Sequence, residues 1–203
     1  ALALGWDDVH SLKRMGKKWE RRGKDHLARN CYQRWLMLDP DNTAAYRATV
    51  PMEALTEQWD NVERLGMAWR SLDQKDPEPW MYLALSYRER DQVPRALECW
   101  RQGETLTMGM AAEKRPPVDW DEVDLWMTFC LEQRDGHSPG IALEQYQLIL
   151  QRDTPTKAKP YQRLGRLYEK TKQWAEAIAA YGQGIEIIDR KSTRLNSSHV
   201  RTS

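Results

Sequence analysis

The stretch from Gly16 to Lys24 reads GKKWERRGK and is the segment closest in type to a phosphate-binding loop. Such a loop needs glycines at a fixed spacing, a lysine, and a Ser or Thr directly after the lysine to hold Mg²⁺. Here six residues separate Gly16 from Gly23, and Asp25 follows Lys24. No strand is expected before the segment. We therefore predict no nucleotide site, and both glycines need a different explanation.

The other residues capable of chemistry are isolated. His10, His26 and His137 have no second ligand at the i, i+4 spacing that would place two metal ligands on one helical face. Cys130 has no adjacent His to act as a base, and a buried thiol explains it better than a nucleophile. No G-x-S-x-G motif is present. We predict no catalytic residue, no metal site and no cofactor, and hence no enzyme.

Four carboxylates lie close together in the sequence, at Asp119, Asp121, Glu122 and Asp124. They could bind a cation, supply a catalytic pair, or form an acidic patch that faces a partner. Carboxylates at the start of a helix also accept its unpaired backbone N–H groups and favour the positive end of its dipole. Helix capping is the preferred interpretation, and the other three remain alternatives.

The sequence also contains a repeated unit of 34 residues, and the residues discussed above fall within or between its copies. Large residues recur at unit positions 4, 7, 11 and 24, and small residues recur at positions 8, 20 and 27. This spacing predicts two amphipathic helices per unit that approach closely at the small residues. The first unit, counted from Val9, shows the pattern at Leu12, Met15, Gly16, Trp19, Ala28 and Tyr32. The unit that starts at Pro77 shows it at Trp80, Leu83, Ala84, Tyr87, Ala96, Trp100 and Gly103, and the unit that starts at Ala158 shows it at Tyr161, Leu164, Gly165, Tyr168, Ala177, Tyr181 and Gly184.

These residues resemble the tetratricopeptide repeat (TPR) family, and the resemblance covers most of the chain. It implies an all-α fold, a right-handed superhelical solenoid of antiparallel helix pairs with about five TPR-like units. Residues 9–110 would form three units, of which the second is irregular because Glu53 replaces an aromatic and Pro51 lies inside the first helix. Proline costs about 3 kcal/mol inside a helix, so we expect this helix to be kinked, shortened or shifted. Residues 111–122 would be a non-repeat insert that contains Pro116-Pro117, and residues 123–188 would form two further units.

The composition changes after Ile188. Residues 189–203 read DRKSTRLNSSHVRTS and resemble translated sequencing-adapter read-through, which predicts a non-natural tail. The tail holds four basic residues and one acid, so the formal charge of +1 for the whole chain leaves −2 for residues 1–188. A broadly positive surface is absent, and we therefore predict no nucleic-acid partner.

The TPR resemblance implies a concave groove lined by the first helix of each unit, mainly at unit positions 2, 5, 9 and 12. We expect this groove to be apolar in the middle and basic toward both ends, and to bind an extended or helical peptide with acidic residues. Ordinary solvated lysines and leucines packed between neighbouring helices are the alternative explanation. The predicted groove residues are Lys13, Lys17, Arg47, Met81, Leu85, Arg88, Met127, Leu131 and Arg166.

The predicted function is a non-catalytic protein-interaction scaffold or adaptor. The alternative is a recruitment module of a larger enzyme, whose catalytic domain would lie beyond the C-terminus of this sequence. Capture of chaperone C-terminal tails is not expected, because Lys17 and Ala48 replace the two asparagines that this TPR subset needs, although Lys13 matches. No apolar run approaches the roughly 20 residues that span a bilayer, so no membrane insertion is predicted. The three widely spaced cysteines favour a reducing compartment such as the cytoplasm.

Overall fold

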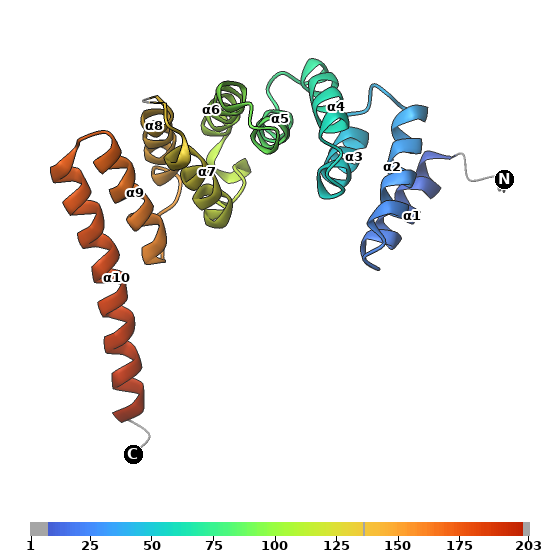
Figure 1. Cartoon of the computed structure of the whole chain (residues 1–203). Helices are drawn as coiled ribbons and strands as arrows, with labels where there is room; N and C mark the ends of the chain where they lie inside the picture. Colours follow the sequence, from blue (N-terminus) through green and yellow to red (C-terminus); the bar gives the residue numbers. More distant parts are fainter. Residues whose placement is uncertain (1–7, 136, 201–203) are drawn as a thin grey trace. The chain divides into compact units, whose positions relative to one another are not determined.

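The computed structural model describes residues 8–135 and 137–200, with side chains described up to residue 190. The described residues form ten α-helices and one short 3₁₀-helix and contain no strand, which confirms the all-α prediction. Consecutive helices form hairpins (Figure 1). The chain separates into two compact units, residues 1–106 and residues 107–203. The predicted boundaries of the repeat units stay a prediction.

The first compact unit begins with five complete helices. These are α1 (Val9–Glu20), α2 (Asp25–Leu38), α3 (Thr43–Leu55), α4 (Trp59–Leu72) and α5 (Glu78–Glu89), followed by α6 (Val93–Gly109). Helices α1 to α4 each contact the next one along the chain. Local sequence signals set the helix ends: the Asp8 carboxylate accepts from the backbone N–H of Ser11 at 2.9 Å, and Asn42 caps α3 in the same way. Gly23 turns the chain between α1 and α2 with a φ of 63°, a conformation that glycine adopts without a steric penalty.

The core of this unit depends on large and small residues that meet across each hairpin. Trp35 and Trp69, both at unit position 27, are buried in α2 and α4. In α6 the same position is Gly103, and the space that a side chain would need is taken by Met81 of α5, whose Sδ lies 2.6 Å from where a Cβ would be. Protein interiors tolerate few voids, so the space between the paired helices is filled from one side or from the other.

The irregular part of this unit is α3, which continues through Pro51. It is as long as α7 and α9, so the expectation of a shortened helix is wrong. Val50, Met52 and Glu53 are all buried beside the proline, and this tertiary burial outweighs the local cost of proline. The fully buried Glu53 carboxylate accepts a hydrogen bond from the Gln33 side-chain amide. A second amide donates to it at 3.0 Å, from Asn61 Nδ2.

The second compact unit contains two complete hairpins. After a short 3₁₀-helix (Ala112–Lys114) come α7 (Trp120–Glu132), α8 (Ser138–Leu150), α9 (Ala158–Lys170) and α10 (Trp174–Val200). Helix α9 contacts α7, α8 and α10, so the first helices of the two hairpins lie side by side. The Asp119 side chain accepts from the backbone N–H groups of Asp121 and Glu122, which confirms capping for this member of the acidic cluster.

Helix α10 runs without a break past Asp189, where the composition changes. The helix therefore includes most of the predicted non-natural tail, and residues 201–203 of that tail lie outside the described residues. The origin of residues 189–203 stays a prediction.

Candidate functional site

The candidate site is built where α7 and α9 lie side by side. Asp124, in the second turn of α7, is buried and forms ion pairs with two cations of α9. Arg163 Nε donates to its Oδ1 at 2.8 Å, and Lys159 Nζ lies 2.7 Å from its Oδ2. Burial raises the pKa of the Asp124 carboxyl, but the hydrogen bonds from Lys159 and Arg163 outweigh burial and hold that pKa below its usual value. Asp124 is therefore ionised and ties the two helices together.

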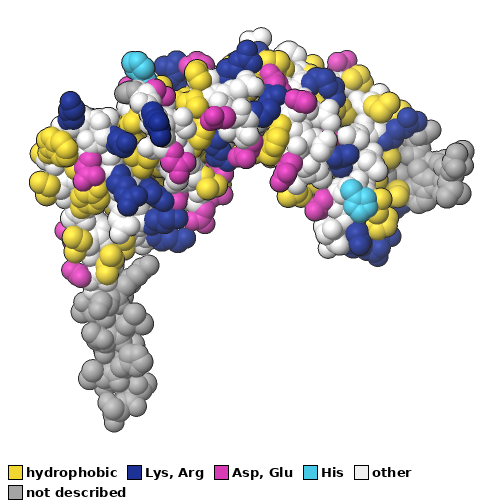
Figure 2. Space-filling model, viewed as in Figure 1, with side chains coloured by type: hydrophobic (Ala, Val, Ile, Leu, Met, Phe, Trp, Pro, Cys, Tyr) yellow, Lys and Arg dark blue, Asp and Glu magenta, His cyan; other side chains and the backbone are white. Residues whose placement is uncertain are grey.

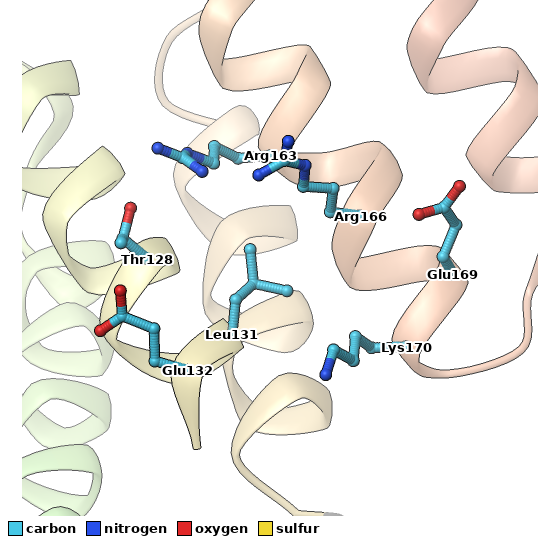
Figure 3. Close-up of a pocket in the computed structure, with 7 residues that line it drawn as sticks. All are labelled: Thr128, Leu131, Glu132, Arg163, Arg166, Glu169 and Lys170. Carbon is cyan, nitrogen blue, oxygen red and sulfur yellow. The ribbon is translucent and has the colours of Figure 1, made fainter. Parts of the chain in front are cut away.

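A pocket of about 480 Å³ lies along the same two helices. Side chains from α7 and from α9 approach it from opposite sides (Figure 3). Leu131 supplies an apolar wall, and the Thr128 hydroxyl donates to the Asp124 carbonyl of its own helix at 2.8 Å. The lining residues are Thr128, Leu131 and Glu132 of α7 and Arg163, Arg166, Glu169 and Lys170 of α9.

The charged side chains of this pocket differ in whether they already have a partner. Arg163 is committed to Asp124, and Glu169 accepts a hydrogen bond from the Tyr181 hydroxyl. Within the part of the chain that the structure describes, no ion pair is formed by Arg166 or Lys170, and both side chains are exposed. Lys and Arg side chains gather at the surface over α9 (Figure 2). The pocket therefore presents two available cations beside a leucine, which suits a carboxylate attached to an apolar chain.

Two of the predicted groove cations are neutralised by carboxylates of the first compact unit. Arg47 pairs with Asp76 at 2.7 Å and with Glu78 at 2.8 Å. Arg88 pairs with Glu89 at 3.3 Å. These cations already have carboxylate partners, so they are poor candidates for binding a carboxylate of a ligand.

The remaining cations of that unit differ from each other. Lys13 Nζ lies 4.1 Å from the ring centre of Trp35, a cation–π arrangement that still leaves the ammonium partly exposed. Lys17 is exposed on α1. Neither residue lines the pocket along α7 and α9.

The apolar residues that were predicted to line the groove lie in different environments. Met127 is fully buried in the core, so it is no groove contact in this structure. Met81 packs against Gly103 of α6, and Leu85 is half-buried on α5. Of the nine predicted residues, the pocket brings together Leu131 and Arg166, which share unit position 9.

The nine predicted residues do not include five that line the pocket, namely Thr128, Glu132, Arg163, Glu169 and Lys170. Of these, Glu169 lies at unit position 12, one of the expected groove positions. A signal for part of this set was present, because Arg163, Arg166 and Lys170 follow an i, i+3, i+7 spacing that places three cations on one face of a helix. Glu132 and Thr128 carry no comparable pattern.

Metal binding and membrane insertion can be judged for the described residues alone. In that part of the chain no group of three or more His, Cys, Asp or Glu side chains could hold a metal ion. Of the helices described, none combines the length and the apolar character needed to cross a membrane.

No protein-family model and no curated protein matches this chain. Solved structures do match. A crystal structure of MamA has a TM-score of 0.70 at 17% sequence identity and covers 94% of this chain and 96% of its own. YrrB, described as a TPR protein with an unusual peptide-binding site, has a TM-score of 0.62 at 14% identity, with 95% and 93% covered. TTC0263, a thermophilic TPR protein of Thermus thermophilus, has a TM-score of 0.51 at 15% identity, with 93% and 99% covered. The chain therefore has a TPR-like fold.

Proposed function

We propose that this chain is a non-catalytic protein-interaction scaffold that binds an acidic peptide or helix at the pocket between α7 and α9. The observation that carries the proposal is the exposure of Arg166 and Lys170 beside Leu131, with no carboxylate partner for either cation among the residues that the structure describes. A guanidinium can accept a carboxylate through two parallel hydrogen bonds, and a lysine adds a mobile point charge. Leu131 contributes a contact for an aliphatic side chain of the same peptide.

The buried Asp124 supports this assignment. Its ion pair with Arg163 fixes the spacing of α7 and α9 and so keeps the floor of the pocket in place before a ligand arrives. A site that is already ordered loses less conformational freedom on binding. Asp124 pairs with Arg163, so the Arg166 guanidinium and the Lys170 ammonium, one and two turns further along α9, remain available to a ligand.

Two comparisons bear on this proposal. The fold is shared with YrrB, for which a peptide-binding site is described, and this favours peptide recognition by a TPR-like fold. The alternative, a recruitment module of a larger enzyme, has no observation in its favour. The preference for acidic ligands rests on the charges of the pocket alone.

The test is fluorescence anisotropy with a short labelled peptide of alternating Asp and Leu, compared with the same peptide carrying Asn in place of Asp. Exposed ion pairs contribute about 0.2–1 kcal/mol each, so loss of two predicts roughly a tenfold weakening for Arg166→Glu/Lys170→Glu. The matched control is Lys114→Glu/Lys172→Glu, which changes the charge equally at exposed sites outside the pocket. Equal weakening by both double variants, or equal affinity for the Asp and Asn peptides, would reject the pocket as an acidic-peptide site.

A further inference from the structure

The pocket along α7 and α9 contains negative as well as positive side chains. Its two carboxylates are Glu132 of α7 and Glu169 of α9. Glu169 already has a partner, because the Tyr181 hydroxyl of α10 donates a hydrogen bond to it. Glu132 is exposed, and among the residues that the structure describes it has no ion-pair partner and no side-chain hydrogen-bond donor. The pocket therefore holds a carboxylate that is available to a ligand, and an acidic peptide does not use it.

Glu132 lies where a helix favours a cation. It is the last residue of α7, and the last turn of that helix contains no basic residue. The unpaired carbonyl groups at the C-terminal end of a helix carry a partial negative charge, which repels a carboxylate and attracts a cation. The side-chain amide of Gln133 donates to the Phe129 carbonyl at 3.0 Å, and this neutral contact leaves the charge of Glu132 in place. A cation of a ligand is therefore attracted by Glu132 and by the helix end together.

The available charges of opposite sign lie on different walls of the pocket. Figure 3 shows Leu131 between Glu132 on the α7 side and Lys170 on the α9 side. Arg166 and Lys170 are four residues apart and share one face of α9. The pocket is therefore negative at the end of α7 and positive along α9, with an apolar side chain between the two walls.

A peptide that satisfies both walls carries an acidic and a basic side chain on the same face. In an extended chain, residues two positions apart point to the same face and lie about 7 Å from each other. The axes of packed helices are about 8–10 Å apart, so a short acid and a long base at this spacing reach both walls. The methylene groups of the base would lie on Leu131 while its charged end reaches Glu132. A second acid in place of the base would meet Glu132 as a like charge, which is unfavourable.

We propose that the partner segment is a peptide of mixed charge, in which a basic residue lies two positions from the acidic one and pairs with Glu132. This inference rests on the proposed function, because Arg166 and Lys170 hold the acidic residue. It adds a specificity-determining residue on α7 to a site whose available cations are on α9. The recognised feature is thus an acid and a base together.

The test is fluorescence anisotropy of the full chain with the labelled peptides Leu-Asp-Leu-Lys-Leu-Asp-Leu and Leu-Asp-Leu-Gln-Leu-Asp-Leu. The central residue has an Asp two positions away on each side, so both directions of the bound peptide are covered. One exposed ion pair predicts that the Lys peptide binds about two- to fivefold more tightly than the Gln peptide. Glu132→Gln should remove this preference, and Glu132→Lys should reverse it.

The matched control is Glu144→Gln, which removes an exposed carboxylate of α8 that does not line the pocket and should keep the preference for the Lys peptide. Loss of the preference in both Gln variants would mark a long-range charge effect and overturn the inference. Equal affinity of the unsubstituted chain for the two peptides, or a preference that survives Glu132→Gln, would also overturn it, because Glu132 is then a solvated surface carboxylate.

Failure of this inference can be told from failure of the proposed function. A third peptide carries Lys at the centre and Asn in place of both Asp residues. If the Asp residues contribute to affinity and the central Lys does not, the inference alone fails. If the Asn peptide binds as tightly as the Asp peptide, the proposed function fails, and the inference that rests on it fails as well.

Discussion

Replacing Gly16 with alanine tests the closest approach in the first hairpin. A Cβ at this position of α1 would lie 2.2 Å from Tyr32 Cε1 and 2.6 Å from Cζ, whereas ordinary contact begins near 3.4 Å. The ring cannot move away freely, because Tyr32 is buried in α2 and its hydroxyl donates to Glu20 at 2.5 Å. The ring or the helix must therefore shift by more than about 1 Å, a case of overpacking.

The expected magnitude is the difference between two opposing effects. Overpacking of a buried site costs about 1–3 kcal/mol. Alanine in place of glycine inside a helix contributes about 1 kcal/mol in the stabilising direction. The required shift of more than about 1 Å places the overpacking cost in the upper part of this range, so Gly16→Ala should lower the free energy of unfolding by about 1–2 kcal/mol. The assay is urea unfolding followed by tryptophan fluorescence, supported by hydrogen exchange of α1 and α2.

Two other glycines provide matched controls. Gly165 meets the Tyr181 ring at a similar 2.4 Å, and the Tyr181 hydroxyl also donates to a glutamate, but this ring is only partly buried, so Gly165→Ala should cost less than Gly16→Ala. Gly182→Ala adds a Cβ in open space and should stabilise the chain by about 0.5–1 kcal/mol. In a Tyr32→Leu background, Gly16→Ala should no longer destabilise the chain and should raise its stability by up to about 1 kcal/mol, since the clashing ring is gone and the helix preference of alanine remains. A Gly16→Ala variant as stable as the unsubstituted chain would refute the reasoning.

Four further measurements probe other parts of the structure. Trp100→Ala should lower the free energy of unfolding by about 3–5 kcal/mol in urea unfolding, because the side chain is fully buried; a loss under about 1 kcal/mol contradicts this. Glu53→Ala should cost about 1–3 kcal/mol in the same assay, because two amide donors lose their buried acceptor. The Asp124 pKa is lowered in the folded chain, so its contribution is complete above pH ~3.9 and is lost as the pH falls through the folded value; Asp124→Asn should flatten this acid limb of stability. Burial and the hydrogen bond to a carboxylate raise the pKa of Tyr87 to about 12, so its contribution is complete below pH ~10 and is lost as the pH rises to about 12, and Tyr87→Phe should remove this alkaline limb.

The sequence predicted the helical repeat well because its signals are local. The i, i+3, i+4 spacing of large residues, the small residue at unit position 8 and the turn at Gly23 each concern neighbours on one helix or hairpin. Their geometry follows from the helical period without knowledge of the rest of the chain. At α3 the same reasoning expected a kinked, shortened or shifted helix, and of these the shortened helix is wrong, because tertiary burial keeps Pro51 inside a helix of 13 residues.

The candidate pocket could be predicted only in part. Leu131 and Arg166 were predicted as groove residues, and both line the pocket. Met127 was predicted beside them, yet it turns into the core. Met127 and Leu131 lie four residues apart on the same face of α7, so helical spacing does not tell the residue that enters the core from the residue that lines the pocket.

What the sequence by itself determined is the fold class, the hairpin spacing and the large and small positions that interlock, since these depend on residues within one unit. Only the tertiary structure decided which charges are available to a ligand. Arg47 pairs with carboxylates 29 and 31 residues away, and Arg163 pairs with one 39 residues away, while Arg166 has no such pair among the described residues. Coulomb attraction acts over a few ångströms in space rather than along the chain, so the neutralised cations cannot be told from the available ones until helices from different hairpins are placed side by side.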